Sequence, residues 1–203
     1  MTVKADCPAP AAYEAAATRL GCDVDWIRAF AKVEAGPHGG FLDDGTPVIL
    51  FEPHIFHRLT DGKHGGAYIA EAHGAKWGIL SRPKWERGTY GPVEVQHLRL
   101  ATAVRLDRDA ALRSASWGLF QLLGDNFLTC GHATLQSFIN AMYRGADAHL
   151  AGFVAFCMAR PKLVKALREK DMETAFDVYN GKGWRANQYD VKFAAALSDT
   201  VRA

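Results

Sequence analysis

The stretch from Asp23 to Glu52, DVDWIRAFAKVEAGPHGGFLDDGTPVILFE, contains the residues that decide the fold. In its first part, apolar side chains recur at spacings of three and four: Trp26, Ile27, Phe30 and Val33. This spacing predicts an amphipathic helix with one buried face. Asp23 is suited to cap the start of that helix, and the pair Gly36-Pro37 ends it.

The second part of the stretch predicts a β-hairpin, because an Asp-Gly step separates Phe41-Leu42 from the β-prone run 48–51. Upstream, residues 9–20 are rich in helix formers and end at Gly21, a candidate C-cap. Downstream, Pro53 opens a short helix over 53–59. The glycine-rich segment 60–92 predicts a long surface loop, and such loops usually have a function.

The rest of the chain is predicted to be helical, with Thr134, Pro161 and Asp171 at helix starts. The expected helices cover 94–106, 108–113, 118–123, 134–159 with a break near Gly145, the residues after 161, the residues from 171 to before Gly181, and 185–202. The fold class is therefore mainly α (α+β), helical with one small β-hairpin. We expect a single domain over residues 1–203.

Charge and composition exclude several functional classes. The formal net charge is +2, from 24 basic and 22 acidic residues, so we expect no nucleic-acid partner. The longest charge-free apolar run, 150–159, is too short to cross a bilayer and predicts a buried helix, so we expect no membrane insertion. The four cysteines form no CxxC pair and are expected to be buried or half-buried free thiols. We also expect a monomer.

Glu34 is the first candidate catalytic residue. It lies four residues after Phe30 and seven after Ile27, so it shares the apolar face of its helix. It also lies in the last turn, where the helix dipole disfavours an anion, and both effects raise a carboxyl pKa. A carboxylic acid that stays protonated near neutral pH can protonate a glycosidic oxygen. The alternative is a structural glutamate at a helix end.

Two later segments contain side chains suited to a sugar. SASWGLFQLLGDN (114–126) places Gln121 within a short apolar segment, where an amide needs a hydrogen-bond partner. VYNGKGWRANQYDVK (178–192) places Tyr179 and Asn180 before a glycine-rich turn, with Tyr189 after it. An aromatic ring stacks on the C–H face of a sugar, and an amide bonds its hydroxyls.

Taken in order, these motifs resemble a known enzyme superfamily. Glu-Ala-Gly (34–36), Ser-Trp-Gly-Leu-Phe-Gln (116–121) and Tyr-Asn-Gly (179–181) are similar to motifs of goose-type lysozymes and soluble lytic transglycosylases. With the segment GGFLDDGTPVILFEPHIFHRLT (39–60), the chain more closely resembles the phage-type N-acetylmuramidase domain of modular endolysins. The resemblance extends over about residues 10–200.

The resemblance implies a lysozyme-like fold and a peptidoglycan-degrading N-acetylmuramidase without a cofactor or metal. Glu34 would be the general acid at the β-1,4 bond between N-acetylmuramic acid and N-acetylglucosamine, with water as the nucleophile. The substrate contacts implied are Ser116, Trp117, Gln121, Tyr179, Asn180 and Tyr189. The chain departs from the superfamily at Ala35, where a serine is usual, and we expect no separate cell-wall-binding domain.

The second carboxylate is left open between Asp43, Asp44 and Glu52. In goose-type enzymes, aspartates in the β-region after the glutamate position the attacking water, and Asp43 and Asp44 occupy the corresponding hairpin. Asp44 followed by Gly45 is equally suited to make the turn itself. Glu52 shares a strand face with Leu50, so it either lines the cleft or forms a structural ion pair with His57 or Arg58.

Three further alternatives remain open. A lytic transglycosylase would use Glu34 alone and release an anhydro product. A zinc peptidase or amidase would rest on Glu52, His54 and His57, although the order HExxH is absent. A non-catalytic cell-wall-binding module would explain the aromatic residues. The loop residues Trp77, Trp85 and Tyr90 form either a saccharide platform or loop anchors, among Lys76, Arg82, Lys84 and Arg87.

The chain begins without an apolar signal segment, because Asp6, Glu14 and Arg19 interrupt the alanine-rich residues. We therefore expect synthesis in the bacterial cytoplasm and action on peptidoglycan in the periplasm after release or delivery.

Overall fold

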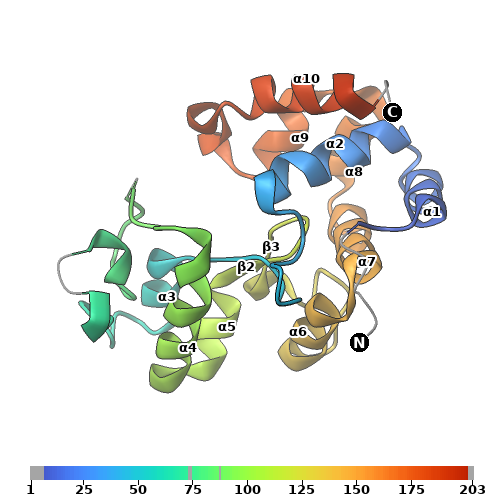
Figure 1. Cartoon of the computed structure of the whole chain (residues 1–203). Coiled ribbons are helices and arrows are strands. Elements are labelled where there is room, and N and C mark those ends of the chain that lie inside the picture. The colour runs from blue at the N-terminus through green and yellow to red at the C-terminus, as the bar shows by residue number, and fades with distance from the viewer. Residues whose placement is uncertain (1–6, 73–74, 87, 201–203) are drawn as a thin grey trace.

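The computed structural model describes residues 7–72, 75–86 and 88–200, and Figure 1 shows the course of the chain. Helices dominate these residues, so the predicted mainly α class is confirmed. The α-helices are α1 (Pro10–Leu20), α2 (Val24–Ala35), α3 (Pro53–Leu59), α4 (Gln96–Leu106), α5 (Arg108–Arg113), α6 (Leu135–Arg144), α7 (Ala146–Met158), α8 (Pro161–Glu169), α9 (Met172–Tyr179) and α10 (Tyr189–Thr200). No helix within the described residues is long and apolar enough to span a membrane.

Several helix ends form where the sequence predicts them. Asp23 caps α2 by accepting a hydrogen bond from the backbone amide of Asp25, and Gly21 ends α1 in the left-handed region. Thr134 forms a capping box with Ser137 at the start of α6, and Pro161 is at the first turn of α8. The predicted helix over 185–202 begins later, at Tyr189, because residues 182–187 form a 3-10 turn.

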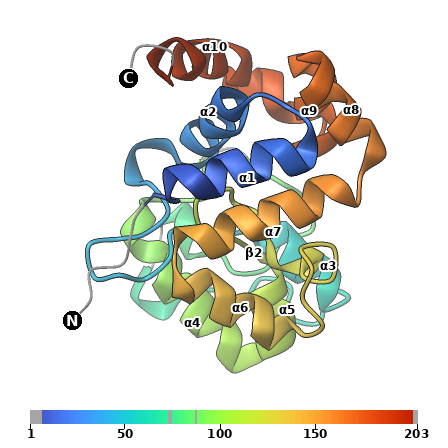
Figure 2. The same ribbon diagram turned by 90° about the vertical axis from the view of Figure 1, so that its right-hand side faces the viewer.

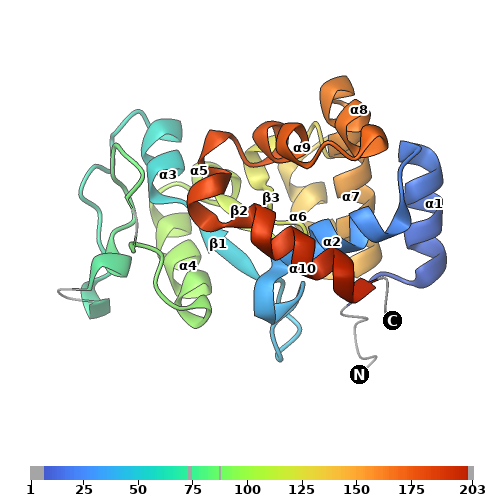
Figure 3. The ribbon, with the colours of Figure 1, turned by 90° about the horizontal axis from the view of Figure 1, so that it is seen from above.

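The described residues form one antiparallel sheet of three short strands: β1 (Ile49–Phe51), β2 (Ala115–Trp117) and β3 (Leu122–Leu123). The register pairs Leu50 with Ser116 and Ser116 with Leu123. In β1 and β2 the residues on either side of these positions are buried, so alternation places Leu50 and Ser116 together on the opposite face. In Figure 3 the strands lie near the middle of the molecule, with α3 and α4 on one side and α1 and α7 on the other.

The prediction of a helix around 118–123 is wrong, because these residues form the turn and the second strand, β3, of the β2–β3 hairpin. Gly118 has a φ of +66°, and a Cβ there would lie 2.4 Å from the imidazole of the buried His149. The Nδ1 of His149 accepts a hydrogen bond from the amide of Leu119 at 3.0 Å, and its Nε2 bonds the carbonyl of Met142 at 2.7 Å. A turn without a side chain at Gly118 therefore lets the hairpin pack onto this histidine.

The predicted hairpin over 41–51 forms only in part. Phe41 pairs with Pro47 in an isolated bridge, while β1 pairs with β2 from a distant part of the chain. The segment 60–92 has no α-helix or named strand among its described residues, although Ile69 and Leu80 are buried and anchor it to the core. Arg87 lies outside the described residues.

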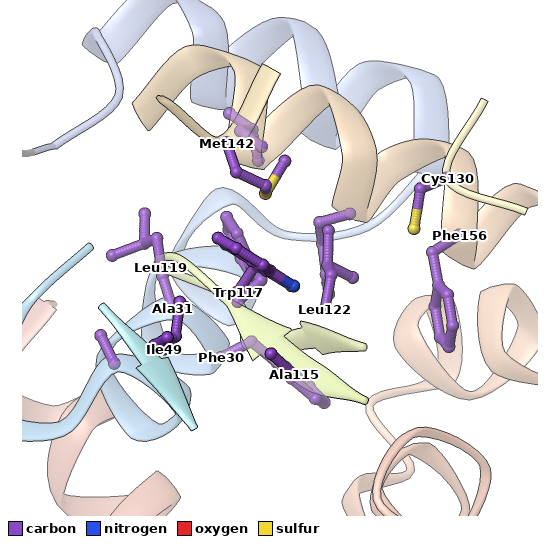
Figure 4. Close-up of a cluster of buried hydrophobic side chains, with 14 of the residues drawn as sticks. Phe30, Ala31, Ile49, Ala115, Trp117, Leu119, Leu122, Cys130, Met142 and Phe156 are labelled. Carbon is purple, nitrogen blue, oxygen red and sulfur yellow. The ribbon is translucent and has the colours of Figure 1, made fainter. Parts of the chain in front are cut away.

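A continuous cluster of buried apolar side chains joins the sheet to the helices. Figure 2 shows α1, α7 and α6 stacked one below another, and Figure 4 shows the side chains between the strands and these helices. The predicted buried run 150–159 forms most of α7. All four cysteines are free, with Cys130 and Cys157 buried and Cys22 half-buried, but Cys7 is exposed and corrects the expectation for that thiol.

Candidate active site

A cleft opens where the end of α2, the face of the sheet and the α9–α10 corner meet. Its inner chamber has a volume of about 360 Å³. Both glutamates named from the sequence line this chamber, together with five of the six residues named as substrate contacts. The lining residues are Glu34, Leu50, Glu52, Ser116, Gln121, Leu122, Leu123, Asn126, Phe156, Tyr179, Asn180 and Tyr189.

Glu34 lies in the last turn of α2 and points into the inner chamber. Its Oε1 accepts a hydrogen bond from Nδ2 of Asn180 at 2.8 Å, and Tyr189 also hydrogen-bonds this carboxyl. Burial raises the pKa of Glu34 to about 7, although these hydrogen bonds and the charge of Lys192 oppose the rise. The carboxyl is therefore half protonated near neutral pH, which suits a proton donor.

The raised pKa of Glu34 predicts a pH-dependent stability. A carboxyl whose folded pKa of about 7 exceeds its ordinary value of 4.5 stabilises the fold fully below about pH 4.5. That contribution is lost as the pH rises through about 7. We expect the melting temperature of Glu34→Gln, relative to the wild type, to increase between pH 4.5 and 8. A difference that stays constant across this range, measured by differential scanning calorimetry, would contradict the raised pKa.

Glu52 follows β1 and faces the same chamber as Leu50, as strand alternation predicts. Its side chain is 16% exposed and makes two contacts through Oε2. The hydroxyl of Tyr90 donates to this oxygen at 2.6 Å, and Nδ1 of His54 lies 3.4 Å from it. Burial raises the pKa of Glu52, while the Tyr90 bond and the charge of Arg99 oppose the rise. The ion pairs proposed with His57 or Arg58 are not the ones that form.

Asp43 and Asp44 do not line the inner chamber. Both are exposed and border a separate hollow beside Pro37 and Glu94. The carboxylate of Asp44 accepts hydrogen bonds from the amide and hydroxyl of Thr46, at 2.8 and 2.6 Å. These bonds lower the pKa of Asp44 and form the turn that the Asp-Gly step predicts.

The walls of the inner chamber come from three elements. Ser116 lies on the cleft face of β2, and Gln121 sits in the β2–β3 turn with a φ of +46°. The side chain of Gln121 is held because Nε2 donates to the carbonyl of Gly118 at 2.9 Å. The hydroxyl of Tyr179, at the end of α9, donates to the carbonyl of Phe120 at 2.7 Å. This bond ties α9 to the hairpin and fixes the width of the chamber between them.

Trp117 is not part of the cleft. It is only 1% exposed, and Nε1 of its indole donates to the carbonyl of Leu112 at 3.2 Å. Figure 4 shows it among Leu119, Leu122 and Met142 in the core. The expected substrate contact at Trp117 is therefore corrected: strand alternation turns its ring away from the face on which Ser116 lies.

An outer chamber of about 630 Å³ shares walls with the inner one, at Leu50, Glu52, Asn180 and Tyr189. Two of the loop aromatics line it: Trp85, whose side chain is 52% exposed, and Tyr90. Trp77 instead packs against the backbone at Gly91, where a Cβ would lie 2.6 Å from it. The loop therefore uses Trp77 as an anchor and presents Trp85 and Tyr90 to the cleft.

The histidines of α3 point to different partners. His54 faces Glu52, whereas Nδ1 of His57 hydrogen-bonds the hydroxyl of Ser81 at 3.0 Å. Within residues 7–72, 75–86 and 88–200, no three His, Cys, Asp or Glu side chains are grouped so that they could hold a metal ion. The arrangement at α3 therefore lacks the ligand set of a zinc peptidase.

Sequence reasoning missed two polar residues behind the site, Gln96 and Arg99 of α4. They are 1% and 0% exposed and share one helix face with the apolar Leu100 and Ala103. That spacing of three and four was the available signal, because a polar side chain on a buried face needs internal partners.

Comparison with known proteins supplies a family and a solved relative. A family model described as Muramidase, N-acetylmuramidase, matches residues 23–200. Among solved structures, that of a Burkholderia AP3 phage endolysin is similar, with 34% sequence identity and a TM-score of 0.77. The match covers 98% of this chain and 73% of that one. No curated protein sequence matches the chain.

Proposed function

Because the chain belongs to the N-acetylmuramidase family, it is a peptidoglycan-degrading glycoside hydrolase, and we propose that Glu34 is its general acid. The bond cleaved is the β-1,4 bond between N-acetylmuramic acid and N-acetylglucosamine. The observation that supports the proposal most directly is the pair of half-buried carboxyls, Glu34 and Glu52, on the walls of one chamber. Two carboxyls flanking the scissile bond are what glycoside hydrolysis requires.

Glu34 supplies the proton to the leaving group. Its raised pKa keeps a substantial protonated fraction near neutral pH, and Asn180 and Tyr189 orient the carboxyl through their hydrogen bonds. In the reaction the proton moves to the glycosidic oxygen as the bond from the anomeric carbon to that oxygen breaks. The leaving sugar departs with a neutral hydroxyl.

Glu52 is the general base in this proposal. Oε2 is engaged by Tyr90, so Oε1 is the oxygen that accepts a proton from the attacking water. The water oxygen bonds to the anomeric carbon, and its proton passes to Glu52. Asp43 and Asp44 are poor candidates for this role because they border another hollow. An inverting enzyme of this type separates its carboxyls by about 6.5–9.5 Å, which leaves room for the water.

The reaction product tests the proposed chemistry. Purified sacculi digested with the enzyme should release muropeptides with a free reducing N-acetylmuramic acid, because water ends the reaction. A lytic transglycosylase would instead close the muramoyl 6-hydroxyl onto the anomeric carbon and give an anhydro product that lacks one water. Mass spectrometry separates the two, and anhydro-muropeptides as the main product would overturn Glu52 as the base.

We expect activity to survive chelation, because α3 lacks a three-ligand set and neither proposed step needs a metal. Excess EDTA should leave the release of muropeptides from purified sacculi unchanged. Sacculi avoid the effect of EDTA on an outer membrane. Loss of activity with EDTA and its recovery with zinc would support the peptidase alternative instead.

The cell wall is the place of action that this family implies. We propose that the enzyme works there as a monomer, after release or delivery from the cytoplasm, because one chain supplies all the described walls of the cleft. A concentration-independent monomer mass in analytical ultracentrifugation would support this, and a stable dimer would contradict it.

A further inference from the structure

The hydrogen bond from Tyr90 to Glu52 joins two parts of the chain that are 38 residues apart. Tyr90 lies near the end of the loop 60–92, and Glu52 directly follows β1. The hydroxyl of Tyr90 donates to Oε2 of Glu52 and also accepts a hydrogen bond from Nε1 of Trp85 at 2.7 Å. Trp85, Tyr90 and Glu52 thus form a chain of hydrogen bonds that runs from the outer chamber to the carboxylate.

Both ends of the Tyr90–Glu52 bond are anchored by the buried side chains of α4. The carbonyl of Tyr90 accepts hydrogen bonds from Nη1 of Arg99, at 3.0 Å, and from Nε2 of Gln96. Oε1 of the same Gln96 accepts from the amide of Phe51, the residue before Glu52, at 3.1 Å. Arg99 also binds the carbonyl of Ile79 at 3.0 Å. One helix therefore fixes the backbone on each side of the contact.

This arrangement is more than a loop anchor. Gln96 and Arg99 already secure the backbone of Tyr90 without its hydroxyl. The hydroxyl makes a separate hydrogen bond to the carboxyl of Glu52, which lines both chambers of the cleft. A hydrogen bond to a charged acceptor is strong and directional, so it restricts the rotation of the carboxylate.

We propose that Tyr90 is a positioning residue for Glu52, and that Trp85 strengthens its hold by donating to the same hydroxyl. The proposal rests on the function proposed above, in which Glu52 is the general base. Tyr90 occupies Oε2 and leaves Oε1 directed to the water. Trp85 makes the hydroxyl a better donor, because a hydroxyl that accepts a hydrogen bond is polarised along the chain.

The same contact sets the charge of Glu52. Burial favours the protonated carboxyl, which is useless as a base, and the bond from Tyr90 favours the carboxylate. The other groups facing Glu52 are His54 of α3, Arg99 of α4 and Tyr189 of α10, with Glu34 across the chamber. Burial lowers the pKa of His54 and so favours its neutral form. Arg99 is therefore the group among these that remains positively charged. Without the Tyr90 hydroxyl, the pKa of Glu52 should rise further.

The variant Tyr90→Phe tests the proposal, because it removes only the hydroxyl. The pKa of Glu52 should rise by about one unit, as the loss of a hydrogen bond to a charged group predicts. The titration is followed by NMR on protein labelled with ¹³C at the glutamate carboxyls, with the Glu52 signal assigned from Glu52→Gln. The acidic limb of the pH profile of kcat/KM should move upward equally, and kcat should fall more than KM changes.

Tyr143→Phe is the matched control, since Tyr143 lies on α6 and outside both chambers. It should leave the Glu52 titration and the acidic limb in place. An unshifted Glu52 titration in folded Tyr90→Phe, or an equal shift in the control, would overturn the proposal. The NMR titration does not depend on turnover. A fully active Glu52→Gln would therefore refute the base role while the Tyr90 contact is still decided by the titration.

Trp85→Phe keeps an aromatic ring and removes the N–H donor. We expect a smaller shift of the Glu52 pKa in the same direction, and no further shift when the substitution is added to Tyr90→Phe. If Trp85→Phe shifts the Glu52 pKa equally in the wild type and in Tyr90→Phe, then Trp85 does not act through the Tyr90 hydroxyl, which contradicts this part of the proposal. If Tyr90→Phe fails to fold, Trp85→Phe carries the test alone, and an unshifted Glu52 in it would overturn the proposal.

Discussion

The Glu34→Gln variant is expected to lyse cells at least about 10²-fold more slowly than the wild type, because a glutamine amide cannot donate the proton that the leaving sugar needs. The substitution preserves the shape of the side chain, and its amide oxygen can still accept the bond from Asn180. The fold should therefore remain intact at neutral pH. Turbidity loss of Gram-negative cells stripped of their outer membrane measures the rate.

Glu14→Gln on the exposed face of α1 is the matched control, since it removes a carboxylate far from the cleft. It should lyse cells at the wild-type rate. In the wild type, activity should fall as the pH rises above about 7, where Glu34 loses its proton. Near-normal lysis by folded Glu34→Gln would end the assignment of Glu34 as the acid.

The features of the site that depend on local spacing could be predicted from the sequence. Glu34 follows Phe30 by four residues on a helix capped by Asp23, and the structure places it in the cleft with a raised pKa. Glu52 follows Leu50 by two residues, and both line the chamber. In each case the period of one helix or strand determines the direction of the side chain.

The β2–β3 hairpin could not be predicted in the same way. A short, mostly apolar run such as Leu119 to Leu123 fits either a helix or a strand. β1, which pairs with the first strand of this hairpin, β2, lies more than 60 residues earlier in the chain. Two tertiary contacts favour the hairpin over a helix: Gly118 packs on His149, and Ser116 pairs with Leu50. The same pairing determines which face of β2 is buried, and Trp117 lies on that face.

The hydrogen-bond network behind Glu52 could not be predicted from the sequence for another reason. The partners of Gln96 and Arg99 are mainly backbone carbonyls of the loop, at Tyr90, Pro92 and Ile79. A carbonyl is present at every residue, so the sequence carries no mark of which ones accept these bonds. Only the path of the loop over α4 brings them together.

Glu52→Gln is expected to lower kcat for muropeptide release by about 10²-fold, because an amide cannot accept the proton of the attacking water. Its oxygen still accepts the bond from Tyr90, so the loop and the cleft should keep their form. KM should change less than kcat, since the shape of the chamber is preserved. Kinetics on soluble glycan fragments, with a melting curve for each variant, measure this effect.

Asp43→Asn and Asp44→Asn are the informative controls, because they test the other two candidate carboxylates without altering the turn. An asparagine at position 44 can accept the same bonds from Thr46 as the aspartate does. Both variants should therefore retain wild-type kcat. A large loss in either one, with Glu52→Gln unaffected, would transfer the role of base to the hairpin.

The products of residual turnover then separate water as the nucleophile from the muramoyl hydroxyl. A hydrolase needs a base to activate water, so Glu52→Gln should slow formation of the free reducing end without creating an anhydro product. If water attacks opposite the leaving group, the first product is the inverted anomer, which ¹H NMR detects before mutarotation. A retained anomer would require a covalent intermediate or attack from the same face. Glu52 would then act as a nucleophile or stabilising charge, with Glu34 still the acid.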